Sequence, residues 1–185
     1  VFYKFKKGTP LGGKYGTKLA VNYSVAYSLD SADLGAVDDT TRKLGYRTSF
    51  FRPGERRYFQ DANIEVRKKV SSTWELALSY LNLSYDIDII QGKPGKPVVH
   101  ADIFILEGLH NFTDKNSLRF ELQHLSTAQD HGNWATALAE FTFSPHWFLA
   151  VMDQYNYVTL DETFLQDGKT EVEPERIHYP IGSVG

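Results

Sequence analysis

The segment from Lys18 to Leu29 alternates between two kinds of residue without a break. Apolar or aromatic residues occupy every second position, and small or polar residues lie between them. This period of two predicts a β-strand, because successive side chains of a strand point to opposite faces. The segment is about twice as long as the usual strand of about five or six residues. Its two faces therefore border two different environments, as in the wall of a membrane β-barrel or in a half-buried sheet.

Three later segments continue this alternation, at residues 58–69, 74–87 and 98–109. In the second of them the apolar residues change phase by one position. They occupy even-numbered positions up to Tyr80 and odd-numbered positions from Leu81 onward. A change of phase within one strand predicts a β-bulge, in this case near Tyr80.

Residues 117–143 allow two interpretations. Good helix formers are frequent there, and leucines recur at helical spacing, which predicts a pair of helices. The same residues also alternate with a period of two, which predicts a hairpin with its turn in residues 129–133. The hairpin would place charged residues on one face and apolar residues on the other. The charged residues are Arg119, Glu121 and Glu140, and the apolar ones are Phe120, Leu122, Phe141 and Phe143.

The connections between the expected strands alternate in length. Short ones lie at residues 70–72 and 144–146, and longer ones at 30–44, 90–97 and 158–173. Outer-membrane barrels show this asymmetry, with short turns on the periplasmic side and longer loops outside. We therefore predict an all-β fold for residues 1–185, a single domain built as an antiparallel meander of eight or nine long strands and forming part of an outer-membrane β-barrel.

Composition excludes several classes of protein. The chain has no cysteine, so it has neither a disulfide framework nor a thiolate metal site. Its 20 basic and 23 acidic residues are spread along the chain and form no basic stripe, which excludes nucleic acid as a partner. No apolar run approaches the roughly 18 residues of a membrane-spanning helix. Hydropathy alone therefore indicates a soluble protein, although the alternating strands of a barrel also look polar on average.

No catalytic, cofactor or metal site is predicted. The residues Gly8 to Lys14 have the spacing of a phosphate-binding loop, but Tyr15 replaces the required Ser or Thr and a strand follows instead of a helix. The chain also lacks the serine motif and the ordered triad of hydrolases, so we do not expect an enzyme. The histidines have no zinc-binding spacing and are expected to be scattered. They are His100, His110, His124, His131, His146 and His178.

Several polar residues lie opposite apolar faces of the expected strands. A charge on a lipid-facing surface costs about 2–4 kcal/mol near the bilayer midplane, so alternation places these residues in the barrel lumen. They either set the preference for ions or solutes, or pair with one another to fill the interior. The expected lumen-lining residues are Glu65, Arg67, Arg119, Glu121, Gln123 and Glu140. Aromatic residues near strand ends are expected in interfacial girdles, namely Tyr27, Trp74, Tyr85, Trp134, Trp147 and Tyr157.

Residues 115–157 carry a resemblance to a known family. The segments concerned are Leu118–Leu125, Gln129–Ala135, Ser144–Phe148 and Asp153–Tyr157. Together they resemble a family of uncharacterised outer-membrane barrel proteins from Bacteroidetes. The resemblance implies a barrel in the cell outer membrane, in contact with the lipid bilayer and lipopolysaccharide, with no cofactor and no catalytic residue to assign. Members of that family are longer than this chain, so an incomplete piece of a barrel is expected.

Three functions are compatible with these patterns. The first is a porin-like channel for small polar solutes. The second is a non-conducting barrel that serves as a scaffold and docks partner proteins. The third is a soluble β-sandwich that acts as a binding module. In the first two the apolar strand faces contact lipid, whereas in the third they form a protein core.

Overall fold

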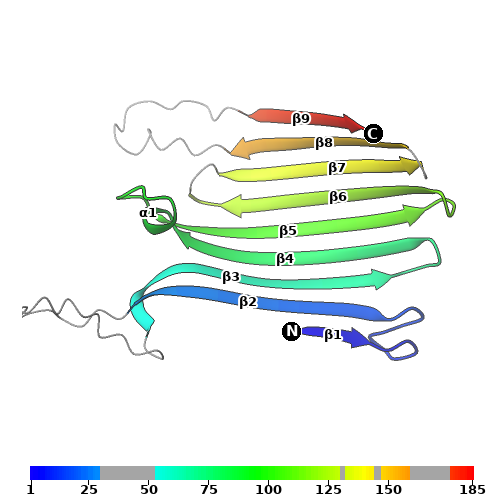
Figure 1. Cartoon of the computed structure of the whole chain (residues 1–185), viewed down its shortest axis with the longest axis horizontal. Coiled ribbons are helices and arrows are strands. Elements are labelled where there is room, and N and C mark those ends of the chain that lie inside the picture. The colour runs from blue at the N-terminus through cyan, green and yellow to red at the C-terminus, as the bar shows by residue number, and fades with distance from the viewer. Residues whose placement is uncertain (30–52, 130–131, 144–146, 159–175) are drawn as a thin grey trace, which may run out of the picture.

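The computed structural model describes residues 1–29, 53–129, 132–143, 147–158 and 176–185. Over these residues, nine strands form one sheet in which each strand pairs with its neighbours in the sequence (Figure 1). The strands are β1 (Phe2–Phe5), β2 (Thr17–Leu29), β3 (Pro53–Lys69), β4 (Trp74–Asp86), β5 (Val98–Asn111), β6 (Asn116–Thr127), β7 (Asn133–Phe143), β8 (Trp147–Val158) and β9 (Ile177–Val184). One short helix, α1 (Ile87–Ile90), follows β4.

The sheet is an antiparallel meander, as the alternation predicted. Every neighbouring pair of strands is antiparallel, and β1 and β9 lie at opposite edges, so the sheet is not closed (Figure 1). Residues 117–143 form the predicted hairpin of β6 and β7, and the alternative of two helices is wrong. The glycine of the hairpin turn, Gly132, has a φ of 75°, a conformation that glycine adopts without strain. Within the described residues, no helix has the length and apolar character needed to cross a membrane.

The pairing register divides the side chains between two faces. One cross-strand row contains Lys18, Arg67, Ala77, Glu107 and Glu121, and we call the face on which it lies the charged face. The adjacent row contains Leu19, Val66, Leu78, Leu106 and Leu122, and we call its face the apolar face. The predicted hairpin faces are confirmed, because Arg119 and Glu140 pair on the charged face while Leu118 and Phe141 pair on the apolar face.

The β-bulge predicted near Tyr80 is wrong. The register of β4 continues through Tyr80 without a shift, toward β3 on one side and toward β5 on the other. The change of phase in the sequence instead marks a change in the chemistry of both faces. Beyond Tyr80 the apolar face becomes polar at Asn82, and the charged face becomes apolar at Leu81 and Leu83.

Two of the short turns use the same hydrogen bonds. At the β3–β4 turn, the Ser71 hydroxyl accepts hydrogen bonds from the backbone N–H groups of Thr73 and Trp74. At the β5–β6 turn, the Thr113 hydroxyl accepts them from the backbone N–H groups of Lys115 and Asn116. A hydroxyl that replaces a backbone acceptor in this way stabilises a tight turn. Both turns lie at the same end of the sheet (Figure 1). The other connection predicted to be short, residues 144–146, lies outside the described residues.

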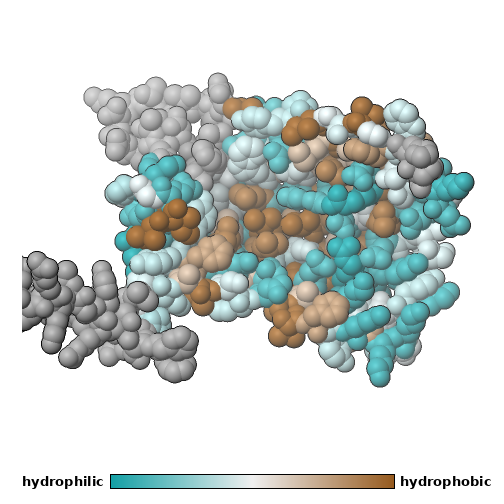
Figure 2. All heavy atoms as spheres, in the orientation of Figure 1, coloured by the Kyte–Doolittle hydropathy of each residue, from teal (hydrophilic) through white to brown (hydrophobic). Residues whose placement is uncertain are grey.

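The charged face is the more enclosed of the two. On β6, Leu122 of the apolar face is 48% exposed, whereas the side chain of the adjacent Glu121 is only 17% exposed. On β5, Phe104 is 50% exposed while the side chain of Glu107 is 23% exposed. In a soluble half-buried sheet the apolar face is the enclosed one. Figure 2 shows one face, on which hydrophilic side chains gather over the end that carries the short turns and hydrophobic ones lie mostly nearer the middle.

Candidate functional site

An ion pair that crosses a whole strand lies at the centre of the charged face. Arg67 on β3 places Nη1 2.7 Å from Oε1 of Glu107 on β5. The strand between them, β4, contributes Ala77, which pairs with both residues in register and is 4% exposed. Neighbouring strands lie about 4.8 Å apart, so the two backbones are separated by roughly 10 Å. The guanidinium reaches Glu107 because the methyl group of Ala77 leaves room above β4.

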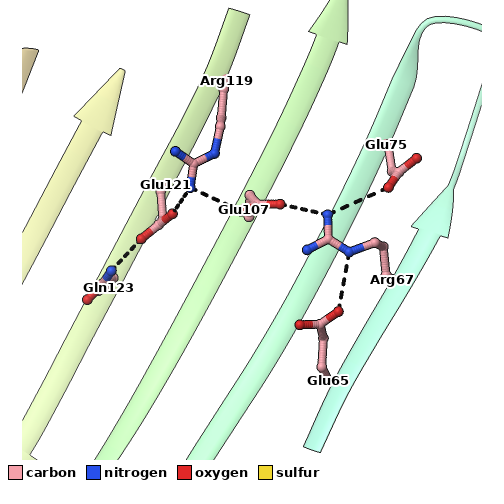
Figure 3. A network of polar contacts seen from close by, with 7 residues as sticks. All are labelled: Glu65, Arg67, Glu75, Glu107, Arg119, Glu121 and Gln123. Atoms are coloured by element: carbon pink, nitrogen blue, oxygen red, sulfur yellow. Dashed lines mark hydrogen bonds and ion pairs between the residues drawn. The ribbon is translucent and has the colours of Figure 1, made fainter. Parts of the chain in front are cut away.

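Glu107 joins this pair to a second arginine. Its other carboxylate oxygen lies 3.2 Å from Nη2 of Arg119 on β6. Arg119 also pairs with Glu121, which in turn accepts a hydrogen bond from the Gln123 side chain. Figure 3 shows Glu107 between the two arginines, each of which extends toward it from a different strand. The result is a continuous polar network across β3, β4, β5 and β6.

Arg67 has two further carboxylate partners. Its Nε lies 3.2 Å from Oε1 of Glu65, and its Nη1 lies 3.6 Å from Oε1 of Glu75. Both arginines therefore contact at least two carboxylates, and no guanidinium of the network relies on a single partner. The side chains involved are 17–41% exposed, and at such exposure each ion pair contributes only about 0–1 kcal/mol to stability. The network orients its members more than it stabilises the sheet.

Five of the six residues predicted to line a lumen belong to this network: Glu65, Arg67, Arg119, Glu121 and Gln123. The sixth, Glu140, lies on the same face and pairs in register with Arg119. Sequence reasoning missed Glu107 and Glu75. Glu107 has an odd position in the strand of residues 98–109, and this position would have assigned it to the charged face. Because apolar residues occupy both faces of that strand, the alternation is not evident there.

The charged face nearly balances its charges around the network. Lys18 pairs in register with Arg67, and Lys69 pairs with Glu75. Lys4 lies in the same row, because it pairs in register with Lys18. Together with Arg67 and Arg119 these lysines oppose the carboxylates of Glu65, Glu75, Glu107, Glu121 and Glu140. Five cations therefore face five carboxylates on this part of the sheet. Such a surface attracts polar molecules without a strong preference for one sign of charge.

The apolar face carries an apolar stretch of constant length on three strands. On β3 it lies between Lys68 and Gln60, on β5 between His110 and Asp102, and on β6 between Asn116 and His124. In each case the two polar residues are eight positions apart, and three positions between them face the same side. Those positions are Ala62, Ile64 and Val66 on β3, Phe104, Leu106 and Gly108 on β5, and Leu118, Phe120 and Leu122 on β6.

These stretches form a band that runs obliquely across the sheet. On the side of the longer connections, the band ends at Gln60 on β3 and at Asp153 on β8. The register places Asp153 in the same row as Val66, which is six residues from Gln60. A shift of six residues across five strand spacings, at about 3.3 Å per residue and about 4.8 Å per spacing, corresponds to an angle of about 40°. The band therefore lies about 40° from the perpendicular to the strands.

Aromatic rings gather at one border of the band. At the end that carries the short turns, Trp74 stacks on His110 with ring centroids 4.3 Å apart, and His110 meets Phe112 edge-on at 4.5 Å. The row continues through Phe112, Phe141 and Phe143. Of the aromatic residues predicted to form girdles, Trp74, Trp147 and Tyr157 lie on the apolar face. The prediction is wrong for Tyr85 and Trp134, because the register places both on the charged face.

A charged cluster lies beyond the band, at the end of the longer connections. Arg56 at the start of β3 binds the Asp86 carboxylate through Nε at 2.5 Å and through Nη2 at 2.9 Å. The same Nη2 lies 3.2 Å from Asp88, whose other oxygen accepts the backbone N–H of Lys96 at 2.8 Å. The hydrogen bonds from Arg56 lower the pKa of Asp86 below its ordinary value. This cluster fixes α1 and the residues after it to the start of β3.

Among the described residues, neither the histidines nor the glycine-rich loop forms a recognisable site. Within the residues that the structure describes, no three His, Cys, Asp or Glu side chains gather where they could hold a metal ion. His131 and His146 lie outside those residues. The loop from Gly8 to Lys14 is a series of turns, and β2 follows it directly, as predicted.

Comparison with known proteins gives a family and nothing more specific. No curated protein matches the chain, and no solved structure matches it. The sequence does match a protein family over residues 1–185, which is the whole chain. That family is described as a family of unknown function (DUF6029), and the protein is a member of it.

Proposed function

We propose that this chain forms part of the wall of a β-barrel in the cell outer membrane, with its apolar face toward lipid and its charged face toward an aqueous lumen. We further propose that the lumen passes small polar solutes and that the protein is a passive channel, without catalysis or a cofactor. The bilayer and lipopolysaccharide are then the partners of the apolar face. The observation that carries the proposal is the oblique apolar band.

The angle of the band agrees with the geometry of membrane barrels. Strands of such barrels are tilted by about 35–45° from the membrane normal, so a horizontal slab of lipid crosses them obliquely. The band of this sheet requires about 40°, given the spacings of a β-sheet. Eight residues span about 26 Å along a strand, or about 20 Å along the membrane normal at this tilt, close to the apolar belt of about 25 Å in barrels.

The exposure of the two faces supports the same assignment. Leu78 on the apolar face is 57% exposed and Val151 is 56% exposed, and such a continuous apolar surface requires an apolar environment. The charged network lies on the more enclosed face, where the lumen of a barrel would keep it hydrated. The resemblance of residues 115–157 to outer-membrane barrel proteins of Bacteroidetes points in the same direction.

The chemistry of the charged face favours a channel for polar solutes. Its arginines and carboxylates are mutually paired and partly exposed, and together with the lysines of the same face they present hydrogen-bonding groups with little net charge. Recording from planar bilayers separates the channel from the scaffold that docks partner proteins. Stable open currents support the channel. A barrel that inserts without any open current supports the scaffold instead.

A depth measurement along one register row tests the barrel wall directly. Val66, Leu106, Leu122 and Asp153 lie in a single row perpendicular to the strands. Each is replaced singly by cysteine, a residue type that is absent from residues 1–185, and is spin-labelled in vesicles. The oblique band predicts that Leu106 lies deepest, that Val66 and Leu122 lie nearer to opposite interfaces, and that Asp153 lies at the interface on the side of Leu122. Oxygen should therefore reach the label at Leu106 best and the label at Asp153 least.

Labels on the charged face provide the control for this measurement. Labels at Arg67 and Glu121, on the charged face, should be accessible to a water-soluble relaxation agent and not to oxygen dissolved in lipid. If all four labels on the apolar face report the same depth, the strands are not tilted in a bilayer. If they are freely accessible to the water-soluble agent, the sheet does not face lipid, and a soluble binding module is supported instead.

A further inference from the structure

The loop that joins β1 to β2 is rich in lysine. Residues 1–20 contain five lysines and neither aspartate nor glutamate. The loop lies at the end of the sheet that carries the short turns (Figure 1). Hydrogen bonds hold its shape, because the Thr17 hydroxyl donates to the Leu11 carbonyl at 2.7 Å. In addition, the Gly13 N–H donates to the Thr9 carbonyl at 2.8 Å. The loop therefore presents its lysines from a defined backbone.

Three lysines gather where this loop meets the end of β3. Lys14 and Lys69 place Nζ 5.4 Å and 5.8 Å from the centroid of the Tyr15 ring. Lys68 places Nζ close to Gly13, since a Cβ atom there would lie 3.5 Å from it. We call Lys14, Lys68 and Lys69 the lysine cluster. Its like charges repel one another, and an anion among them would relieve the repulsion.

The lysine cluster has no carboxylate partner among the described residues. Glu75 is the register partner of Lys69, but its carboxylate lies 3.6 Å from Arg67 and forms no ion pair with the lysine. The other two lysines of the cluster form no ion pair with a described residue either. The positive charge of the cluster is therefore available to an external anion.

The lysine cluster lies at the border of the apolar band. Lys68 is the polar residue at which the apolar stretch of β3 ends. Phe5 lies in the same cross-strand row, because both residues pair with Thr17. The Phe5 ring meets Tyr3 edge-on at 4.8 Å, and Leu11 is exposed in the neighbouring loop. At such a border the alkyl stem of a lysine lies along apolar surface while its ammonium reaches the level of the lipid headgroups.

We propose, on the basis of the proposed barrel wall, that the lysine cluster binds the headgroup phosphate of an anionic phospholipid. Short turns of outer-membrane barrels lie on the periplasmic side, where the leaflet consists of phospholipids. The exposed Leu11 and the aromatic pair beside Lys68 favour a lipid over a soluble anion, because they would contact its acyl chains. Each lysine near an anionic membrane surface strengthens the attraction by about fivefold.

Lipid selection at a fluorophore in the loop tests the proposal. The full-length protein with Leu11→Cys carries the fluorophore and is reconstituted in phosphatidylcholine vesicles. A nitroxide near the headgroup end of the acyl chain, on phosphatidylglycerol or on phosphatidylcholine, quenches it at short range. The test variant replaces the lysine cluster by glutamine. The control variant removes the same charge elsewhere, through glutamine at Lys93, Lys96 and Lys115.

The proposal predicts that phosphatidylglycerol binds near the label at least about fivefold more strongly than phosphatidylcholine at low salt. The preference should disappear in the test variant and remain in the control variant. It should also weaken in 1 M NaCl, where the screening length is only about 3 Å. Equal quenching by the two lipids in the native protein overturns the proposal. A preference that both variants keep, or that both lose, overturns it as well.

Two soluble anions separate the lipid from other occupants. If inorganic phosphate abolishes the preference at constant ionic strength, the cluster is a site for free phosphate. If polyglutamate changes the fluorescence of the label and phosphatidylglycerol does not quench it, the cluster faces an acidic protein. Either result overturns the assignment to a lipid headgroup.

A failure of this site differs from a failure of the barrel wall. If the depth measurement along the register row succeeds while the two lipids quench equally, the sheet faces lipid but the lysine cluster selects no headgroup. If the depth measurement fails, the proposed function fails irrespective of the quenching at the loop.

Discussion

The ring of Phe120 on β6 covers Gly108, its register partner on β5, so closely that a Cβ atom at Gly108 would lie 2.2 Å from a ring carbon. Glycine is therefore required at this position by packing and not by backbone conformation. The aromatic ring replaces the side chain that glycine lacks, and it completes the apolar band on a strand that would otherwise have a gap.

Replacing Gly108 by alanine should destabilise the sheet by about 1–3 kcal/mol, because the Phe120 ring must move away from β5. The matched control is Gly182→Ala. Gly182 lies in the same register row of the apolar face, and a Cβ there would meet no atom within 4 Å. Urea unfolding in detergent micelles measures both variants. Equal stability of the two variants would show that the ring does not constrain Gly108.

Leu78→Arg should impair membrane assembly, whereas Ser79→Arg should not. Leu78 lies on the apolar face of β4 and Ser79 on the charged face. An arginine near the bilayer midplane costs about 2–4 kcal/mol, while a lumen position tolerates it. The shift of the folded band in gel mobility after heating reports assembly. Because Leu78 is already 57% exposed, a soluble sheet would tolerate both changes, and that result would contradict the membrane assignment.

Glu107→Gln should move the ion selectivity of the proposed channel toward anions. The Glu107 carboxylate binds both Arg67 and Arg119, so its neutralisation leaves two guanidinium groups with less compensation. The reversal potential in a salt gradient measures the change. Asp102→Asn is the control, because it removes the same charge from the apolar face, where the carboxylate accepts hydrogen bonds from Tyr80 and Asn82. An equal shift in both variants would argue against a lumen position for Glu107.

Asp86 should contribute stability that is lost in acid. Its folded-state pKa lies below the ordinary value of 3.8 because Arg56 donates hydrogen bonds to its carboxylate. The unfolded chain therefore takes up the proton more readily, and the contribution is complete above pH 3.8 and declines as the pH falls through the folded-state value. The difference in unfolding free energy between the native protein and Asp86→Asn should shrink over that range.

Arg56→Gln supplies the control for this pH dependence. Without the guanidinium, Asp86 loses the largest cause of its lowered pKa and keeps only the backbone hydrogen bonds from Asp88 and Ile89, so the profile of this variant should run closer to that of Asp86→Asn than the native profile does. The difference in unfolding free energy between the native protein and each variant could instead stay constant down to the lowest pH. That result would show that the pair does not control acid stability.

The period of two was sufficient to predict most of the fold. The strict alternation in Lys18–Leu29 identified β2, and the weaker alternation in residues 117–143 identified the β6–β7 hairpin against a competing helical pattern. Sequence parity also assigned Glu65, Arg67, Arg119 and Glu121 to one face. It failed at Tyr80, because a change in the polarity of both faces has the same appearance in a sequence as an inserted residue.

The contacts within the charged network could not be predicted from the sequence. Arg67 and Glu107 are 40 positions apart, and their meeting depends on the register of two strand pairs and on the small side chain of Ala77. An odd or even position in a strand determines the face on which a residue lies, but it does not determine the neighbours of that residue on adjacent strands. Glu107 was missed for a further reason, since Ile103 and Ile105 make its own face look apolar.

Polar residues lie at both ends of each apolar stretch. They also limit how far neighbouring strands can slide past one another. A slip by one residue exchanges the two faces, but a slip by two residues preserves them, so alternation alone does not select a register. In this sheet a two-residue slip of β3 would carry Lys68 or Gln60 one row into the apolar band, which faces lipid in the proposed barrel wall. Side chains such as Lys68 would then lose water, at a cost that rises toward the bilayer midplane. The membrane itself would thus select the pairing that the turns at Ser71 and Thr113 begin.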